Sequence, residues 1–435
     1  MRYHLMGISG SGMSGMARWL AHLGHEVGGC DRSCTAESSE GGVRRMPGHG
    51  PEHVRGIDVL VYSAAVPGDH PEIAAARASS IRVLRRSEML AELASAHDVI
   101  AVAGAHGKST TSAMTGWALQ QAGLDPTVLV GAEVPGWRSG FRPGGRLAVI
   151  EADEYDRAFL RLPHLHAAVT SFDHEHLECY GSPEALRSAF ETFLELSAPG
   201  GGVVVPVEEM ELARWASRIG RRVLPAGPGG AFDCVPVGPD GWGEVYSLAG
   251  ITGRLGIPGL QNLRNAATAH ALLHFAGLSP EEAAGPLGSF PGAMRRLQRL
   301  GSRGGILVIS DYAHHPAEME ASMNALRRVL KGSIAVVFEP HLYSRTASLH
   351  SGMGAALALA DVSAVLPVFP AREEPLPGVD ATLVVRDAAA SGADCTVLDP
   401  DGLEGFVDGC GCGAVVLMGA GTSDALARRL VEAGS

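Results

Sequence analysis

The chain of 435 residues is long enough for two or three domains, and its composition, 46% hydrophobic and 19% charged, is typical of a globular protein. Its net charge of −12 argues against nucleic acid or an anionic membrane as the main partner. No apolar run approaches the roughly 20 residues that cross a bilayer, and the N-terminus lacks a signal-peptide pattern, so we expect a cytoplasmic protein without membrane insertion.

Cysteine and lysine are distributed unusually. The seven cysteines are odd in number and scattered, which makes a poor disulfide framework. The close pairs Cys30/Cys34 and Cys410/Cys412 have no CxxC spacing or matching histidine, so we expect no metal site at the cysteines. Only two of the 35 basic residues are lysines, Lys108 and Lys331, which makes each of them a candidate for a specific role.

Three segments follow one another, with boundaries near residues 97 and 298. Apolar strands alternate with helices in each, which indicates parallel sheets covered on both faces and therefore an α/β fold. In the first segment we expect a strand at 3–8, a helix at 13–23, a strand ending at Asp31 and a strand at 59–62.

The second and third segments repeat this alternation. In the second we expect a strand from 98, a helix from 108, strands at 147–151 and 166–172, a β-rich extension over 200–258 and a helix at 261–276. In the third we expect strands at 306–310, 334–338, 364–369 and 414–419, with helices at 316–330, near 349–360 and at the end.

The first glycine-rich turn contains Gly10, Gly12 and Gly15 between a strand and a helix. Glycines there allow a backbone to approach a pyrophosphate at the helix N-terminus. Asp31 ends the next strand, at about the 20-residue spacing of a ribose contact. The turn predicts a nucleotide or a nucleotide-sugar diphosphate, with a simple packing turn as the alternative.

The second glycine turn, Gly104-Ala-His106-Gly107-Lys108-Ser109-Thr110, also follows a strand and opens a helix. Its ending matches the Walker A loop, in which lysine reaches the β/γ-phosphates and the next hydroxyl binds Mg²⁺, although the loop is one residue shorter. A compact ammonium inside a closed loop is not easily replaced by arginine, which favours a functional Lys108.

Acidic and imidazole side chains follow the next two strands. The first group is Glu151, Asp153, Glu154 and Asp156, and the second is Asp173, His174, Glu175 and His176. Such ligands suit Mg²⁺ or Mn²⁺. We expect Glu151, Asp173 and His176, nearest the strand ends, to be functional, and Glu154, Asp156 and Glu175 to be solvated.

Polar groups also follow elements further along the chain. Two groupings at strand ends, around Asp311 to His315 and Glu339 to Arg345, are expected to face the crevice where α/β sheets bind ligands. Asn262 and Asn265, at a helix start, and Arg296 could bind adenine and phosphate, although a helix cap and a solvated basic turn are the simpler alternatives.

Taken in order, these residues resemble the Mur ligase family over nearly the whole chain. The matching stretches include GISGSGMSGMA (7–17), RRSEML (85–90), GAHGKSTT (104–111), EADEYDRAFL (151–160), TSFDHEHLECYG (170–181), PGLQNLRNA (258–266), DYAHHPAE (311–318) and EPHLYSRT (339–346).

The resemblance implies three domains: a Rossmann-like UDP-sugar-binding domain over 1–97, a central ATP-binding domain with a β-rich extension over 98–298, and a Rossmann-like C-terminal domain over 299–435. It also implies that ATP phosphorylates the lactyl carboxylate of UDP-N-acetylmuramate and that L-alanine attacks the acyl phosphate, releasing ADP and phosphate. Two Mg²⁺ ions, or Mn²⁺, would assist, in a monomer or weak homodimer.

The resemblance also assigns roles to residues. Lys108, Glu151, His176, His314 and Arg345 would be catalytic. ATP would bind Gly104, His106, Gly107, Lys108, Ser109, Thr110, Asn262, Asn265, Arg296 and Asp311. The UDP-sugar would bind Gly10, Ser11, Gly12, Met13, Ser14, Asp31 and Ser63. The amino acid would bind Tyr312, His314, His341 and Arg345. The metal ligands would be Ser109, Asp173, Glu151 and His176.

The chain departs from the family pattern at several positions. Ala105 replaces a threonine, Asp173 a glutamate, Glu339 a glutamine and Leu342 an arginine. Leu342 removes a cation where the family contacts anionic substrate, and Glu339 adds an anion nearby. Alternatives are a recycling ligase that adds a tripeptide to the same sugar nucleotide, a non-catalytic sugar-nucleotide-binding homologue, and an NAD-dependent dehydrogenase, which would leave the second glycine loop unexplained.

Overall fold

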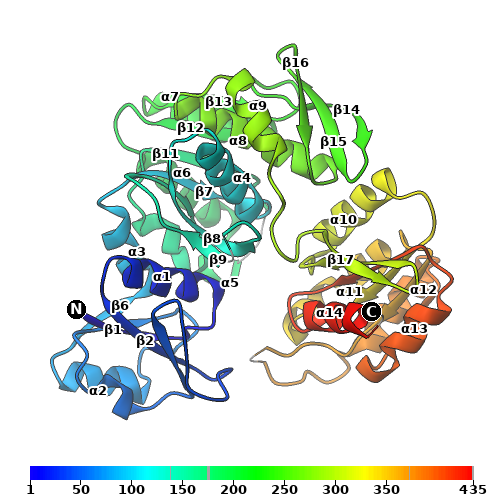
Figure 1. Ribbon diagram of the computed structural model, residues 1–435, viewed down its shortest axis with the longest axis horizontal. Coiled ribbons are helices and arrows are strands. Elements are labelled where there is room, and N and C mark those ends of the chain that lie inside the picture. The colour runs from blue at the N-terminus through cyan, green and yellow to red at the C-terminus, as the bar shows by residue number, and fades with distance from the viewer. Residues whose placement is uncertain (138, 174–176, 372, 434–435) are drawn as a thin grey trace. The chain divides into compact units, whose positions relative to one another are not determined.

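The computed structural model describes residues 1–137, 139–173, 177–371 and 373–433. Its elements alternate between strands and helices along the chain, as Figure 1 shows. Two compact units result. The first contains Met1–Val235, Tyr246–Arg254 and Leu263–Pro291, and the second contains Pro236–Val245, Leu255–Asn262 and the chain from Gly292 onward.

The first sheet has six strands in the order β3-β4-β2-β1-β5-β6, parallel except for the β3–β4 pair. Its strands are β1 (Arg2–Met6), β2 (Glu26–Asp31), β3 (Ser38–Glu40), β4 (Val43–Pro47), β5 (Val59–Tyr62) and β6 (Arg82–Arg85). Its helices are α1 (Ser11–His22), the 3₁₀ helix η1 (Pro51–Val54), α2 (Pro71–Ala78) and α3 (Arg86–Ala94).

The second sheet has seven strands in the order β13-β12-β11-β7-β10-β8-β9, of which only β9 is antiparallel to its neighbour. Its strands are β7 (Asp98–Ala103), β8 (Thr127–Val134), β9 (Ser139–Arg142), β10 (Leu147–Glu151), β11 (His166–Val169), β12 (Gly202–Pro206) and β13 (Arg222–Ala226). The helices of this part are α4 (Lys108–Gln121), η2 (Tyr155–Arg161), α5 (Leu177–Tyr180), α6 (Pro183–Glu195), η3 (Val207–Glu209), α7 (Met210–Arg218), α8 (Leu260–Phe275) and α9 (Pro280–Gly288).

The first two sheets share one hydrophobic cluster, which explains why they fall in one compact unit. Met13 and Trp19 of α1 are buried in the same cluster as Leu129 of β8 and Phe141 of β9. The rings of Trp19 and Phe141 stack with their centroids 5.8 Å apart. Aromatic pairs at this separation add to the stabilisation from burial.

The last sheet has the order β17-β18-β22-β19-β20-β21, with only the β17–β18 pair antiparallel. Its strands are β17 (Gln298–Arg303), β18 (Ile306–Asp311), β19 (Ile334–Phe338), β20 (Val362–Val365), β21 (Cys395–Val397) and β22 (Ala414–Met418). Its helices are α10 (Pro316–Val329), α11 (Tyr343–Leu357), α12 (Ala381–Ala390), η4 (Pro400–Gly402), α13 (Leu403–Gly409) and α14 (Ser423–Glu432).

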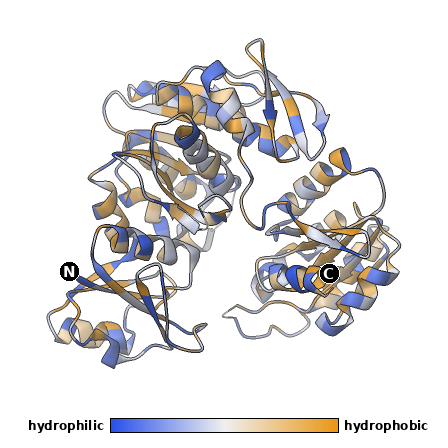
Figure 2. Ribbon diagram, viewed as in Figure 1, coloured by the Kyte–Doolittle hydropathy of each residue, from blue (hydrophilic) through white to orange (hydrophobic). Residues whose placement is uncertain are grey.

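Alternating side chains of the inner strands enter two separate cores. Ile334, Val336 and Phe338 of β19 pack in one cluster, whereas Ala335 and Val337 pack in another on the opposite face. Successive side chains of a strand point to opposite faces, so a strand covered on both faces is apolar throughout. Figure 2 shows this as hydrophobic colouring along the inner strands.

The expected β-rich extension is only partly as predicted. Residues 235–255 form a three-stranded sheet of β14 (Val235–Asp240), β15 (Gly243–Leu248) and β16 (Ile251–Leu255). Residues 202–226 instead extend the second sheet with β12 and β13 and form the helix α7 between them. This helix buries Leu212, Ala213 and Ala216 on one face, a helical period that the flanking glycines and prolines obscured in the sequence.

Other expected elements also differ in their limits. The strand expected at 166–172 ends at Val169, the strand expected at 364–369 ends at Val365, and the helix expected near 349 begins at Tyr343. Among the described helices, none has both the length and the apolar character that a membrane span requires.

Candidate active site

Two helices of the first unit begin directly after the two glycine turns and lack side-chain caps. Neither α1, after Gly10, nor α4, after Gly107, has a capping side chain or an acidic residue in its first turn. Elsewhere Ser182, Ser279 and Asp380 cap α6, α9 and α12. Free N–H groups at a helix start are a ready anion site, so both turns fit a phosphate group.

The second turn holds its lysine inside the loop. Lys108 Nζ donates to the carbonyl oxygens of Gly104 and Ala105 at 2.5 and 3.0 Å, and to Glu154 Oε1 at 2.8 Å. Gly107 has a φ of +82°, a left-handed conformation that favours glycine. The loop therefore curls around the ammonium as a phosphate-binding loop requires.

Glu154, expected to be solvated, is instead buried, with 2% of its surface exposed. Glu154 immediately precedes the 3₁₀ helix η2, and its Oε1 lies 2.8 Å from Lys108 Nζ. Burial acts to lower the pKa of Lys108, but the charge of Glu154 and its hydrogen bond raise it above its ordinary value. The ammonium is therefore charged, and Glu154 is a site residue that sequence analysis missed.

Oxygen-bearing side chains surround the start of α4. Because β11, β7 and β10 are neighbours in the sheet, the residues that follow them meet at one edge. Ser109 Oγ donates to Glu151 Oε1 at 3.0 Å, and Gly131 N–H donates to Glu151 Oε2 at 2.5 Å. The exposed Asp173 carboxylate lies 3.6 Å from His106 Nε2.

Of the other residues expected here, Asn265 lies against the loop, since a Cβ added to Gly107 would come within 3.2 Å of its Cγ. Thr110 is buried in the first turn of α4. His176, with His174 and Glu175, lies outside the described residues. Asn262 belongs to the second compact unit, where its side chain donates to the Pro258 carbonyl at 2.7 Å.

The first turn is ordered by Asp31 at the end of β2. Its carboxylate accepts hydrogen bonds from the N–H groups of Ser9 and Ser33 at 3.0 and 2.9 Å. Burial acts to raise the pKa of Asp31, and these hydrogen bonds bring it below its ordinary value. Ser63 follows β5 and lies beside Gly7, since a Cβ on that glycine would come within 2.9 Å of Ser63 Oγ.

The residues expected to bind a ligand at the start of α1 differ in their exposure and contacts. Ser11 and Gly12 open α1, and Ser14 Oγ accepts a hydrogen bond from Arg45 at 3.2 Å. The side chain of Met13 is buried in the core, which leaves only its backbone to meet a ligand.

Arg86, to which sequence analysis gave no role, also lies at this helix start. A Cβ on Gly12 would come within 3.3 Å of its guanidinium carbon, and its NH2 group bonds to Asp153 Oδ2 at 3.0 Å. The Arg85-Arg86 pair before a helix is the one signal in the sequence that could have indicated it.

A second group of expected residues lies in the second unit, after β18 and β19. Tyr312 has Arg295 and Arg296 over its ring at 4.7 and 5.1 Å. The His314 ring packs edge-on against His341 with centroids 5.9 Å apart. Burial lowers the pKa of His314; Glu318 opposes this, and the charge of Arg345 adds to it.

Asp311 ends β18 and is held from two sides. Its carboxylate accepts from Ala313 N–H at 2.9 Å and from Ser322 Oγ at 2.8 Å, and burial raises its pKa.

Glu339 does not add a free anion to this group. Its carboxylate accepts hydrogen bonds from Thr422 Oγ1 at 2.5 Å and from Ser423 N–H at 3.1 Å, and 4% of its surface is exposed. The expected effect of this additional anion on substrate binding stays a prediction. Leu342 is the N-cap residue of α11 with a φ of +69°, a strained value for a residue with a side chain.

Three family models match successive stretches of the chain. The Mur ligase family catalytic domain matches residues 2–98, the Mur ligase middle domain matches 102–273, and the Mur ligase glutamate ligase domain matches 295–418. The chain belongs to the Mur ligase family. Its three-domain α/β organisation is that of the family, with the glycine loop of Lys108 in the middle domain and the group around His314 in the third.

Relatives in the Mur ligase family are similar over nearly their full length. A UDP-N-acetylmuramate–L-alanine ligase from Kineococcus radiotolerans is 41% identical, covering 88% of this chain and 85% of the relative. One of the same name from Streptomyces coelicolor is 37% identical, covering 99% and 97%.

Solved structures agree with this. The UDP-N-acetylmuramate-alanine ligase MurC of Thermotoga maritima superposes with a TM-score of 0.85 at 25% identity, covering 100% of this chain and 99% of that one. The fold is also that of a murein peptide ligase from Psychrobacter arcticus, with a TM-score of 0.71 at 23% identity and coverage of 100% and 98%.

Proposed function

We propose that this Mur ligase joins L-alanine to the lactyl carboxylate of UDP-N-acetylmuramate at the expense of ATP, a step in peptidoglycan precursor synthesis. The observation that carries the proposal is similarity to enzymes named for this reaction over nearly the full length of both chains. The use of ATP and a nucleotide sugar agrees with the cytoplasmic location expected from the sequence.

The ATP end of the site is the loop before α4. Its uncapped N–H groups and the buried ammonium of Lys108 fit the phosphates of a nucleotide. Asn265, which lies beside Gly107, is placed to contact the same nucleotide. Glu154 pairs with Lys108 and compensates that buried charge.

The oxygen donors around Ser109 fit Mg²⁺. Hydroxyl and carboxylate oxygens are the ligands that this hard cation prefers, and Ser109, Glu151 and Asp173 supply them at one edge of the sheet. We assign Ser109 and Asp173 to one ion, and Glu151 with His176 to a second. The ions would neutralise negative charge on the phosphoryl group in transfer.

The reaction proceeds in two steps. The lactyl carboxylate oxygen attacks the γ-phosphorus of ATP, ADP leaves, and an acyl phosphate forms. The amine of L-alanine then attacks the acyl carbon, phosphate leaves with the bonding electrons, and the amine loses its proton as the amide forms. Lys108 supplies a fixed positive charge to the transferring group, which in this class of reaction is the main contribution of the protein.

The other two substrates are assigned to the remaining groups. The uncapped start of α1, with Asp31 and Ser63, would hold the UDP-sugar. Tyr312, His314, His341 and Arg345, with Asp311 and Arg296 nearby in the sequence, would serve the amino acid, the sugar carboxylate and the nucleotide.

The test is phosphate release from ATP and Mg²⁺ with UDP-N-acetylmuramate and one acceptor at a time: L-alanine, glycine, L-serine or the recycling tripeptide. We expect phosphate and amide product with L-alanine only. Release driven by the tripeptide would reassign the enzyme to recycling. No release with any acceptor, alongside measurable sugar-nucleotide binding, would indicate a homologue without catalysis.

Lys108→Ala tests the phosphate loop directly. The variant removes the charge that meets the γ-phosphate, so we expect turnover to fall below detection while UDP-N-acetylmuramate still binds, as measured by calorimetry. Lys331→Ala, which changes the exposed second lysine, is the control and should retain full turnover. Turnover that survives in Lys108→Ala would contradict the assignment of the ATP site.

A further inference from the structure

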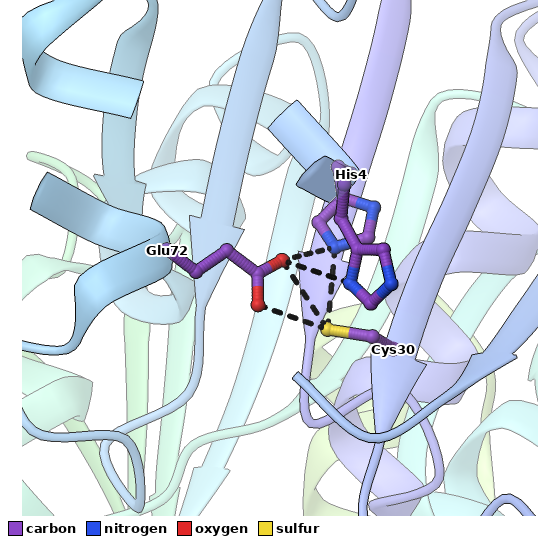
Figure 3. A group of neighbouring side chains, drawn as sticks. His4, Cys30 and Glu72 are labelled. Atoms are coloured by element: carbon purple, nitrogen blue, oxygen red, sulfur yellow. Dashed lines mark hydrogen bonds and ion pairs between the residues drawn. The ribbon is translucent and has the colours of Figure 1, made fainter. Parts of the chain in front are cut away.

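A buried group of histidine, cysteine and glutamate side chains lies in the first sheet. His4 comes from β1, Cys30 from β2, His53 from η1 and Glu72 from the first turn of α2. Figure 3 shows Glu72 pointing from its helix at His4 and Cys30 on the neighbouring strands. One ligand atom from each of the four residues lies within 4.8 Å of all the others.

The strand register explains why the two strand residues meet. Met6 of β1 pairs with Cys30 of β2, and His4 lies two residues before Met6, on the same face. That face carries the apolar cluster of Met6, Leu60 and Ile73 beneath α2.

The separations of the ligand atoms approach those of a tetrahedral metal site. His4 Nε2 lies 3.3 Å from Cys30 Sγ, Cys30 Sγ lies 3.4 Å from Glu72 Oε1, and His53 Nδ1 lies 3.5 Å from that oxygen. Ligand bonds of about 2.0–2.3 Å to zinc place neighbouring ligand atoms roughly 3.3–3.8 Å apart. His4 Nε2 and Glu72 Oε1, at 2.7 Å, are closer than this.

Charge and burial favour a cation at this place. Glu72 and Cys30 have no exposed surface, and His4 is 1% exposed. A buried ionised carboxylate needs a positive partner. A divalent ion bound by one thiolate, one carboxylate and two neutral imidazoles gives a buried group whose net charge is zero.

Outer partners are also present. His49 Nδ1 lies 2.9 Å from Cys30 Sγ, where it can donate to a thiolate, and Gly50 N–H donates to Glu72 Oε2 at 3.0 Å. Such second partners orient metal ligands. The side chains of His49 and His53 are 10% and 13% exposed, so the group lies nearest the surface on their side.

We propose that His4, Cys30, His53 and Glu72 bind one Zn²⁺ ion as a structural site. Two imidazoles, a thiolate and a carboxylate form a donor set that suits Zn²⁺ better than Mg²⁺. Four protein ligands fill the tetrahedral coordination of zinc and leave no open position for catalysis. Binding releases the thiol proton of Cys30 to solvent.

The site would also brace the first glycine turn. The Cys30 carbonyl accepts hydrogen bonds from the N–H groups of Gly7 and Ile8 at 2.8 and 3.2 Å. The residue that supplies the sulfur ligand therefore holds the start of that turn.

The test is metal content and cobalt spectroscopy on the full-length protein. After dialysis against a weak chelator, we expect one equivalent of zinc per chain by mass spectrometry. Replacement by Co²⁺ should give a thiolate-to-cobalt charge-transfer band with the visible bands of a tetrahedral ion. Cys30→Ser should abolish the charge-transfer band and weaken zinc binding by more than the roughly 10–100-fold typical of losing an outer partner.

Controls separate a metal site from a general effect on folding. Cys234→Ser changes another buried cysteine and should retain both zinc and the band. If Cys30→Ser fails to fold, His53→Gln tests the site through a less buried ligand. This variant should also weaken zinc binding. Wild-type protein that retains no zinc and gives no tetrahedral cobalt spectrum would overturn the proposal, leaving a His4–Glu72 ion pair. Neither result bears on the ligase reaction, which is assayed separately.

Discussion

At the scale of single residues, the ion pair of Lys108 and Glu154 is the feature with the largest expected effect. Both groups are largely buried, with Nζ and Oε1 2.8 Å apart. Glu154→Gln leaves the ammonium without its carboxylate, and breaking a buried pair in this way destabilises a protein by about 3–5 kcal/mol. We expect a loss of that order in the free energy of unfolding, measured by chemical denaturation.

Asp156→Asn is the matched control for this variant. Asp156 lies two residues further on and pairs with Arg85 at 3.0 Å, but 42% of its side chain is exposed. Exposed pairs contribute about 0–1 kcal/mol. Equal losses of unfolding free energy in the two variants would show that the burial of Glu154 does not strengthen its ion pair with Lys108.

Leu342 tests whether a missing cation limits substrate capture. Leu342→Arg restores a positive charge at the start of α11, so we expect the KM for UDP-N-acetylmuramate to fall by about tenfold, as a charge-assisted hydrogen bond would provide. Steady-state kinetics measure this. Leu342→Met, without charge, should leave the KM unchanged, and an unchanged KM in Leu342→Arg would mean that another arginine already serves the anion.

At the scale of elements, buried histidines should make stability depend on pH. Burial lowers the pKa of His270 on α8 to about 4, and its Nε2 lies 2.8 Å from the Tyr246 hydroxyl. The unfolded chain, with a pKa near 6.5, binds more protons below that value. The contribution is therefore complete above pH 6.5 and is lost as the pH falls toward 4.

His270→Gln should flatten this dependence. As the pH falls from 6.5 to 4, the free energy of unfolding decreases in both proteins. We expect this decrease to be about 3 kcal/mol smaller in the variant than in the wild type, measured by urea denaturation at several pH values. His164, whose pKa burial also lowers to about 4, remains to supply part of the slope. The exposed His274 lies on the same helix, and His274→Gln should leave the slope as it is.

The elements that could be predicted from sequence are those with a strong local signal. The strand at Val59–Tyr62 has the limits that its apolar run predicts, and the helix after the second glycine turn begins at Lys108 as expected. Short or exposed strands such as Ser38–Glu40 carry no such signal, because their pairing is decided by a neighbouring strand.

The position of a site residue could be predicted where it depends on the adjacent strand, but not where it depends on a contact with a distant part of the chain. Residues next to strand ends, such as Glu151, could be predicted from position alone. Glu154 pairs with Lys108, 46 residues earlier in the chain, and Glu339 pairs with Thr422, more than eighty residues later. Nothing local in the sequence records either contact.

At the scale of the whole molecule, two compact units should unfold as two transitions. Four tryptophans, Trp19, Trp117, Trp137 and Trp215, lie in the first unit, and Trp242 alone lies in the second. Fluorescence therefore reports mainly on the first unit, whereas circular dichroism reports on both. We expect the two thermal curves not to coincide.

Ligand and variant controls sharpen this prediction. UDP-N-acetylmuramate at 100 times its Kd should stabilise the fluorescence transition by about 2.7 kcal/mol. Trp242→Phe should leave the fluorescence curve almost unchanged. Coincident curves from both probes would instead mean that the units unfold together.

The two lysines give the molecule a practical property. The ammonium of Lys108 is enclosed by two carbonyls and Glu154, whereas Lys331 is exposed just beyond the end of α10. Apart from the α-amino group, an amine-reactive dye or a coated sensor surface would thus find one accessible lysine. Amine coupling would therefore attach the enzyme at two defined points, its N-terminus and Lys331, without an engineered handle.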